Sequence, residues 1–252
     1  MTPRHDATAP EAAAHAGAAA GSAATTVVAF DLDDTLYLEE DYVMSGFRAV
    51  DAWLRRRRGV DGLYRAAGRL HEAGVRGRVF DLALAELGHP PDPALVRRMV
   101  RIYREHAPDI RLLPDARVCL HRLRRAGTPL ALVTDGPKDA QRRKLSALLV
   151  EPFFRHIVIS DKLGPGLSKP HAAPFLAVTA AFPDEGTRFV YVGDNPVKDF
   201  ATPRGLGWTT VRVRREKGQY AALEAPPPFA PHAEVGALTE LEALLTGLAE
   251  SP

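Results

Sequence analysis

Short apolar runs and stretches of helical periodicity alternate along most of this chain. Residues 27–30 form the first apolar run, and its consecutive apolar positions are typical of a strand buried on both faces of a parallel sheet. Four more strands are predicted at 129–133, 156–159, 188–192 and 209–213. Helices are predicted at 114–125, 138–149, 197–205 and 238–248, and a further helix is predicted to start at about Pro170 and to end at about Phe182. This alternation predicts an α/β fold, a Rossmann-like, doubly wound parallel sheet with right-handed crossovers.

The segment 38–112 has a different pattern, because its apolar residues recur at helical spacing and no strand is predicted. We therefore expect an inserted α-helical domain at 38–112. The remaining residues, 25–37 and 113–252, are expected to form the Rossmann-like core. Residues 1–24 are rich in Ala and interrupted by Gly and Pro, which favours a disordered tail.

The composition is that of an ordinary soluble protein, with 46% hydrophobic and 25% charged residues. The formal net charge is only +2, so no overall field favours nucleic acid or an anionic membrane as a partner. No apolar stretch is long enough to span a membrane. The single cysteine, Cys119, cannot form an internal disulfide, which fits a cytoplasmic location.

Two basic runs need an interpretation. Arg55–Arg58 is not accompanied by an aromatic ladder, so we predict a solvated helix end rather than a nucleic-acid site. Arg212–Lys217 follows the last predicted strand and could approach an anionic substrate. A solvated loop is the preferred interpretation of this second run.

Polar residues follow three of the predicted strands at the point where each strand ends. Asp31 and Asp33 follow the first strand, Thr134 follows the second, and Asp194 follows the fourth, with Asp199 close behind. Since parallel strands end at one edge of the sheet, these groups are expected to converge there. Crowded carboxylates repel one another unless a cation is present, and Mg²⁺ suits a site with few carboxylates and a phosphate.

These residue types can also be ordinary cap and turn residues at a helix start. Together, however, they supply what phosphoryl transfer needs. A carboxylate can attack phosphorus and form an aspartyl-phosphate, which divides one difficult step into two. A second carboxyl can protonate the leaving oxygen and later deprotonate water. A hydroxyl and a lysine can hold the phosphoryl oxygens.

Four motifs, in this order along the chain, resemble those of the haloacid dehalogenase superfamily. They are Phe30–Leu36 (FDLDDTL), Thr134–Gly136 (TDG), Lys169–Pro170 (KP) and Gly193–Asp199 (GDNPVKD). The resemblance extends over about residues 26–245. It implies that Asp31 is the nucleophile and a Mg²⁺ ligand. Asp33 would be the general acid and base and would lend the metal its backbone carbonyl.

The same resemblance implies the remaining roles. Asp194 would be a further Mg²⁺ ligand, and Asp199 would lie behind the ligands or orient Lys169. The phosphoryl group would be bound by Thr134, Asp135 and Lys169. Lys138 and Lys162 are rival phosphate-binding lysines, and Lys169 is preferred because Pro170 follows it at a predicted helix start. Asp34 stands in the first motif at a position without a chemical role, and we interpret it as a cap or turn acceptor.

Asp33 also bears on the reaction type. Family members that cleave carbon–halogen bonds lack an aspartate at this position, whereas phosphatases and phosphomutases carry one. The insertion at 38–112 resembles a helical cap that closes over the site, which favours small substrates. We therefore predict a Mg²⁺-dependent phosphomonoester hydrolase acting through an aspartyl-phosphate. Its substrate would be a small phosphorylated metabolite such as a nucleotide monophosphate, phosphoglycolate or a sugar phosphate.

Two alternatives to a hydrolase fit the same sequence. A phosphomutase would use the same Asp31 and Asp33, and a non-catalytic regulatory protein would keep the fold without turnover. A monomer and a homodimer both fit the sequence. The insertion offers four candidates for contact with the leaving group, Tyr42, Arg48, Arg76 and Arg78. For each of them taken alone, an ordinary surface or core position is the preferred interpretation.

Overall fold

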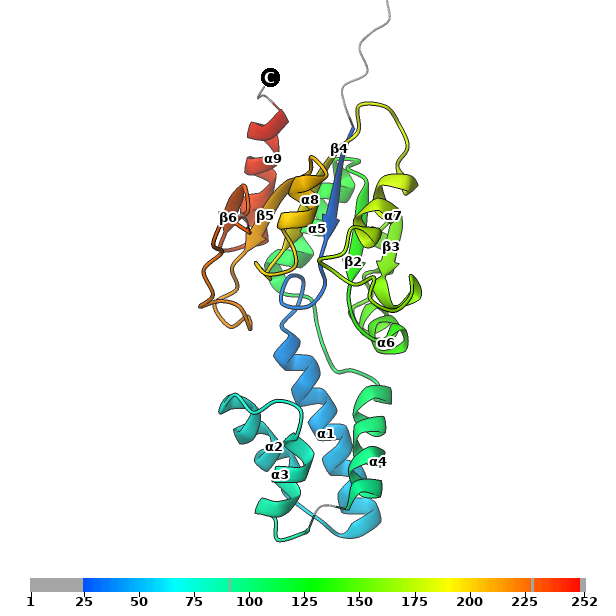
Figure 1. The fold of residues 1–252 in the computed structure, drawn as a ribbon, viewed down its shortest axis with the longest axis vertical. Helices are drawn as coiled ribbons and strands as arrows, with labels where there is room; N and C mark the ends of the chain where they lie inside the picture. Colours follow the sequence, from blue (N-terminus) through cyan, green and yellow to red (C-terminus); the bar gives the residue numbers. More distant parts are fainter. Residues whose placement is uncertain (1–24, 91, 228, 250–252) are drawn as a thin grey trace, which may run out of the picture.

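A six-stranded, all-parallel sheet forms the centre of the larger part of the molecule (Figure 1). The computed structural model describes residues 25–90, 92–227 and 229–249, so the predicted tail at 1–24 lies outside the described residues. The strand order is β3-β2-β1-β4-β5-β6. The bounds are β1 Thr26–Phe30, β2 Leu130–Thr134, β3 His156–Ile159, β4 Arg188–Gly193, β5 Thr209–Val213 and β6 Ala233–Val235. The predicted parallel α/β sheet is confirmed, with β6 as an edge strand that the pattern did not predict.

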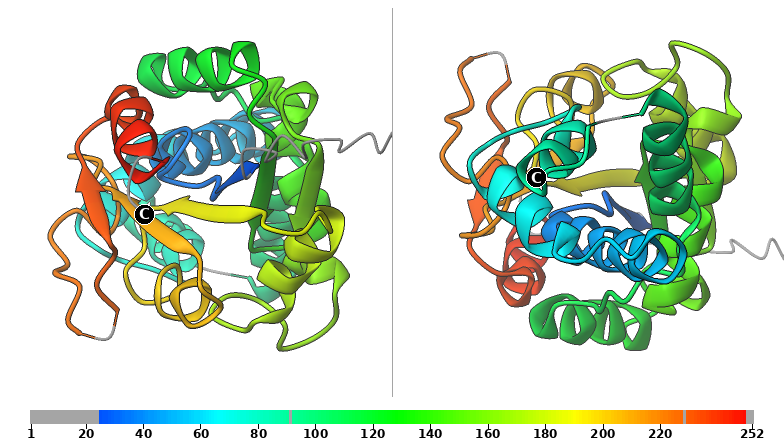
Figure 2. Two further views of the ribbon diagram at one scale, coloured as in Figure 1. Left: turned by 90° about the horizontal axis from the view of Figure 1, so that it is seen from above. Right: turned by 90° about the horizontal axis from the view of Figure 1, so that it is seen from below.

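Each face of the sheet has its own apolar core, because successive side chains of a strand point to opposite sides. Val28 and Phe30 pack in one core together with residues of α5 (Pro114–Arg125) and α9 (Leu241–Ala249). Val27 and Ala29 pack in the other core, against α7 (Ala173–Ala181). Figure 2 shows these helices on the two sides of the sheet. Burial on both faces explains the four consecutive apolar residues in each of β1 and β2.

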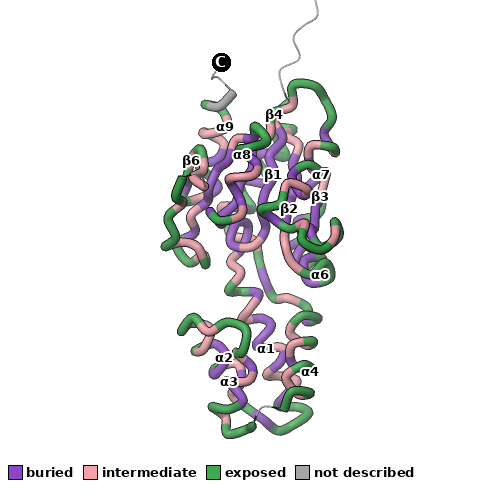
Figure 3. Tube along the Cα trace, in the orientation of Figure 1, coloured by how far each residue is buried: buried purple, intermediate pink, exposed green. Residues whose placement is uncertain are grey.

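Among the described residues, four helices between β1 and α5 form a separate helical unit beyond the carboxyl ends of the strands (Figure 1). They are α1 Glu39–Arg58, α2 Leu63–Glu72, α3 Val79–Glu86 and α4 Pro93–Glu105. The unit has its own buried core, which includes Phe47, Leu54 and Met99 and appears in Figure 3 as a second buried centre. Arg55–Arg58 are exposed at the end of α1, which confirms the predicted solvated helix end.

The remaining helices differ from the predicted ones mainly at their starts. α6 spans Lys138–Leu148 and α8 spans Ala201–Gly205. The helix predicted to start at about Pro170 begins only with α7 at Ala173. Pro170 therefore lies in a loop, and the prediction that it stands at a helix start was wrong. Pro174 occupies the first turn instead, where the missing N–H of proline leaves no bond unmade. Among the described residues, no helix is long and apolar enough to cross a membrane.

Candidate active site

The carboxyl ends of β1, β2 and β4 bring the predicted polar residues to the sheet edge that faces the helical unit (Figure 1). Asp31 directly follows β1, and its backbone N–H donates to the carbonyl of Val192 at 2.8 Å, which extends the pairing with β4 to this residue. Thr134 is the last residue of β2, and Asp194 follows β4. All three side chains are buried.

Asp199 packs directly behind the end of β4, and a glycine makes this possible. A Cβ atom at Gly193 would lie 2.5 Å from Oδ2 of Asp199, which is closer than two such atoms can approach. The backbone N–H of Asn195 donates to the same Oδ2 at 2.9 Å. Gly193 therefore allows the Asp199 carboxylate to lie beside Asp194 and Asp31.

Lys169 joins two of these carboxylates. Its Nζ donates to Oδ1 of Asp31 at 2.7 Å and to Oδ1 of Asp199 at 2.9 Å. The hydroxyl of Tyr191 accepts a third hydrogen bond at 2.7 Å. Burial alone would lower the pKa of Lys169, but Asp199 and Asp31 hold that pKa well above its usual value. The lysine is therefore a fixed cation beside Asp31.

One ammonium does not balance three buried carboxylates. Asp31, Asp194 and Asp199 each place an oxygen within 4.8 Å of the others. Burial raises the pKa of Asp31 to about 6, against the opposing effect of Lys169, and Asp199 adds to the rise. Burial and the charges of Asp199 and Asp31 hold the pKa of Asp194 well above its usual range. The cluster thus carries uncompensated negative charge when all three groups are ionised.

The Asp33 side chain turns away from this cluster toward α6. Lys144 Nζ donates to its Oδ1 at 2.7 Å, and Gln141 Nε2 donates to its Oδ2 at 3.0 Å. The hydroxyl of Tyr37 also donates to Oδ1, and Gln141 donates a second bond to Oγ1 of Thr134. Burial alone would raise the pKa of Asp33, but Lys144 and these donors hold that pKa below its usual value. Sequence reasoning assigned no role to Lys144, Gln141 or Tyr37.

Asp135 accepts two donors rather than pointing freely into the site. The backbone N–H of Lys169 donates to its Oδ1 at 3.2 Å, and Lys198 Nζ lies 3.4 Å from its Oδ2. Asp135 therefore fixes the loop that carries Lys169. Lys198 is a second lysine near the carboxylates. It stands in the fourth motif, but the resemblance to the family implied no role for it. The rival lysines Lys138 and Lys162 are both exposed.

Asp34 behaves as the turn acceptor that we predicted. Its Oδ1 accepts the backbone N–H of Glu39 and its Oδ2 that of Gln219, each at 2.8 Å. Asp34 itself has a φ of +52°, a left-handed conformation that aspartate tolerates better than most residues. The two hydrogen bonds tie the end of the first motif to the start of α1 and to the loop after β5.

The second basic run was predicted as a solvated loop, and this was wrong for two of its arginines. Arg212 is fully buried, and its Nε donates to the carbonyl of Asp194 at 3.2 Å. Arg215 is also buried and donates from Nη2 to the carbonyl of Thr35 at 2.7 Å. Both guanidinium groups satisfy backbone carbonyls of loops at the site, which is a reason to bury a charge that composition alone does not reveal.

The family model of haloacid dehalogenase-like hydrolases matches residues 25–207. The chain belongs to the haloacid dehalogenase-like hydrolases. This match confirms the resemblance inferred from the four motifs, and it includes Asp31, Thr134, Lys169 and Asp194. The chain is therefore an enzyme of a hydrolase family.

Two curated relatives are phosphatases. A glyceraldehyde 3-phosphate phosphatase of Methanopyrus kandleri is 34% identical over 205 residues, which cover 78% of this chain and 86% of that protein. A phosphoserine phosphatase of Thermus thermophilus is 34% identical over 166 residues, covering 66% of this chain and 63% of that protein. Among solved structures, a magnesium-bound HAD-hydrolase of Bacillus subtilis has a TM-score of 0.61 at 21% identity, covering 88% of this chain and 99% of that one. The last match supports the fold alone.

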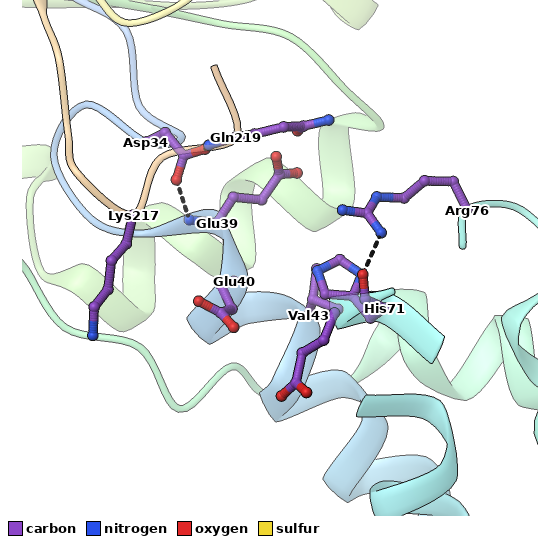
Figure 4. Close-up of a pocket in the computed structure, with 9 residues that line it drawn as sticks. Asp34, Glu39, Glu40, Val43, His71, Arg76, Lys217 and Gln219 are labelled. Carbon is purple, nitrogen blue, oxygen red and sulfur yellow. Dashed lines mark hydrogen bonds between the residues drawn. The ribbon is translucent and has the colours of Figure 1, made fainter. Parts of the chain in front are cut away.

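A cavity of about 310 Å³ lies between the core and the helical unit of this hydrolase (Figure 4). Asp34, Lys217 and Gln219 line it from the core, and Glu39, Glu40, Val43, His71, Glu72 and Arg76 line it from the helical unit. Of the four candidates for contact with the leaving group, Arg76 is among the lining residues. Asp34, the chain neighbour of Asp33, lines the cavity, and burial and the carboxylate of Asp33 raise the pKa of Glu39 to about 7.

The buried aspartates fit a hard divalent cation. Their ligand atoms are carboxylate oxygens, which Mg²⁺ prefers, and the excess negative charge of Asp31, Asp194 and Asp199 is what such an ion would balance. Both oxygens of Asp199 already accept hydrogen bonds, from Lys169 and from the N–H of Asn195. Asp31 and Asp194 are therefore the carboxylates that are available to a metal ion.

Proposed function

We propose that this chain is a Mg²⁺-dependent phosphomonoesterase that acts through an aspartyl-phosphate on a small phosphorylated metabolite. One observation carries the proposal: the carboxylate of Asp31 lies 2.7 Å from Lys169 and within 4.8 Å of the carboxylate of Asp194 at the carboxyl edge of the sheet. The names of the two curated relatives support the same reaction. This arrangement suits a phosphoryl transfer in two steps through Asp31.

In the first half of the reaction, an oxygen of Asp31 attacks phosphorus and forms the acyl-phosphate bond. The ester P–O bond breaks, and its electron pair goes to the leaving oxygen. A proton from the carboxyl of Asp33 neutralises that oxygen, and the alcohol departs. The buried position of Asp31 favours the attack, because few water molecules have to be removed from its carboxylate.

In the second half, water attacks the phosphorus of the aspartyl-phosphate. The carboxylate of Asp33 takes a proton from this water, the acyl-phosphate P–O bond breaks, and Asp31 is regenerated with release of phosphate. Asp33 thus takes up in the second half of the reaction the proton that it gives away in the first half. The same residue can serve as acid and then as base because it faces the same side of phosphorus in both steps.

The phosphoryl oxygens would be held by Thr134 and Lys169, with Asp135 fixing the backbone of Lys169 rather than contacting the anion. Mg²⁺ would be held by Asp31, Asp194 and the backbone carbonyl of Asp33, and it supplies positive charge that offsets the repulsion between carboxylates and phosphate. Asp199 would orient Lys169, since their side chains lie 2.9 Å apart.

The proposal gives the two predicted domains different roles in the reaction. Residues 25–37 and 113–252 would form the catalytic core, and residues 38–112 a cap that closes over it. The cavity of about 310 Å³ between them fits the leaving group of a small metabolite. Triose phosphates and phosphoserine, the substrates that the relatives' names indicate, join nucleotide monophosphates, phosphoglycolate and sugar phosphates as candidates.

A panel of these phosphomonoesters tests the proposal. We expect phosphate release from at least one ester with Mg²⁺ present and none after a chelator has removed the metal ion. The best ester identifies the substrate class. Isomerised sugar phosphate with little free phosphate would instead indicate a phosphomutase. Failure with every ester, together with tight binding of a protein partner, would indicate a regulatory member.

A further inference from the structure

Helix α6 supplies a donor to each oxygen of the Asp33 carboxylate. Lys144 Nζ lies 2.7 Å from Oδ1, and Gln141 Nε2 lies 3.0 Å from Oδ2. The two residues are three positions apart on α6, so they share one face of that helix. This helix begins four residues after Thr134, and its first turns therefore lie at the catalytic edge of the sheet.

Lys144 is almost entirely enclosed. Its side chain is 6% exposed and that of Asp33 is 20% exposed, so the ion pair is largely removed from water. The ring of Tyr42, on α1, lies 4.4 Å from the ammonium and covers another side of it. A buried ammonium without a partner is strongly destabilising, and a buried pair holds a defined geometry. Lys144 is thus fixed between the core and the start of the helical unit.

Gln141 connects Asp33 to the phosphate side of the site. Its amide has two N–H donors, of which one reaches Oδ2 of Asp33 and the other reaches Oγ1 of Thr134. Gln141 is also 1% exposed, so its amide is removed from solvent. Asp33 and Thr134 are in this way held at a fixed separation by one planar group.

We propose that Lys144 and Gln141 are positioning residues that hold the Asp33 carboxyl against the leaving-group oxygen, with Oδ2 as the atom that carries the transferred proton. This inference rests on the proposed phosphomonoesterase function. Lys144 and Tyr37 both donate to Oδ1, so Oδ1 keeps its lone pairs for them. Oδ2 accepts a single bond from Gln141, which leaves its second lone pair for the proton.

The test compares esters that differ in their need for the acid. The nitrophenolate of p-nitrophenyl phosphate departs without a proton, whereas an alkoxide does not, so a misplaced Asp33 slows only the alkyl ester. We measure kcat/KM, which includes the departure of the leaving group, for p-nitrophenyl phosphate and for the best alkyl ester of the panel. Lys144→Met is expected to lower the alkyl value about 100-fold and to change the aryl value little. Lys144→Arg is expected to restore most of the alkyl value.

Three further variants make the comparison decisive. Asp33→Asn gives the full loss expected when the acid is absent and tests the proposed function separately. Arg142→Met, which removes an exposed positive charge from the same helix, is expected to behave as wild type. Gln141→Leu keeps the Lys144–Asp33 ion pair and is expected to show the same preference for the aryl ester, so the test stands even if Lys144→Met does not fold.

Equal losses on both esters in Lys144→Met and Gln141→Leu would overturn the positioning role and leave only a structural one. If Asp33→Asn loses alkyl activity selectively while both α6 variants behave as wild type, the proposed function stands and this inference fails. Absence of turnover by the wild type with every ester would overturn the proposed function and the inference with it.

Discussion

Asp31→Asn is expected to reduce phosphate release by at least about 10⁴-fold, the scale on which enzymes lose activity when their nucleophile is removed. The amide oxygen cannot form the acyl-phosphate bond, so neither half of the reaction can proceed. Steady-state phosphate release from the best ester of the panel, with saturating Mg²⁺, measures the loss. Activity that survives this substitution would contradict the assignment of Asp31 as the nucleophile.

The fold should persist in this variant, because Lys169 keeps Asp199 and Tyr191 as partners. Since the pKa of Asp31 is raised to about 6 in the fold, its ionisation reduces stability as pH rises through that value. At pH 7 without metal, the thermal midpoint of Asp31→Asn should therefore be no lower than that of the wild type. Asp139→Asn, which neutralises an exposed carboxylate of α6, is the matched control and should retain full activity.

Removal of Mg²⁺ is expected to abolish turnover, and Asp194→Asn is expected to require far more Mg²⁺ for any residual activity. The reason is the excess negative charge of the three buried aspartates. Among the described residues, no hydrogen-bond donor contacts the carboxylate of Asp194. Without the ion, these carboxylates and the phosphate of the substrate repel one another. The dependence of activity on Mg²⁺ concentration measures the effect.

Thermal unfolding supplies a second readout for the metal that does not depend on turnover. A cation that binds the folded state raises its midpoint, so Mg²⁺ should stabilise the wild type and Asp139→Asn alike. The increase should be much smaller in Asp194→Asn. Equal stabilisation of Asp194→Asn and the wild type, or full activity in the presence of chelator, would rule out a metal ion at these aspartates.

The strands and the convergence of their polar ends could be predicted because both depend on local pattern. Consecutive apolar residues such as Val27–Phe30 indicate a strand buried on both faces, and the rule that parallel strands end together places Asp31, Thr134 and Asp194 at one edge. The start of α7 could not be placed in the same way. Pro170 and Pro174 both fit the first turn of a helix, so the local pattern does not distinguish between them.

The partners of the Asp33 side chain could not be predicted from local sequence pattern, because Gln141 and Lys144 are 108 and 111 residues away in the chain. A signal was present, however. In α6 these two polar residues occupy the same buried face as Leu145 and Leu148. A polar residue on the apolar face of a helix needs a buried partner, which could have directed attention to them.

The sequence pattern also failed to predict that two arginines are buried. Arg212 and Arg215 stand in a run of charges that predicts a solvated loop, yet each donates to a backbone carbonyl of a distant segment. Arg215 and its acceptor Thr35 are 180 residues apart. Charge patterning describes a helix face or loop in isolation and carries no information about carbonyl groups that another loop leaves unpaired.

The most direct test of the central claim is to trap the phosphorylated enzyme. Wild-type protein is mixed with ³²P-labelled substrate and Mg²⁺, quenched in acid within the first turnover, digested and mapped by peptide. The account predicts a hydroxylamine-sensitive acyl-phosphate on the peptide that contains Asp31, and no label in Asp31→Asn. Turnover with label on another residue, or with no labelled enzyme under any quench time, would contradict a mechanism through Asp31.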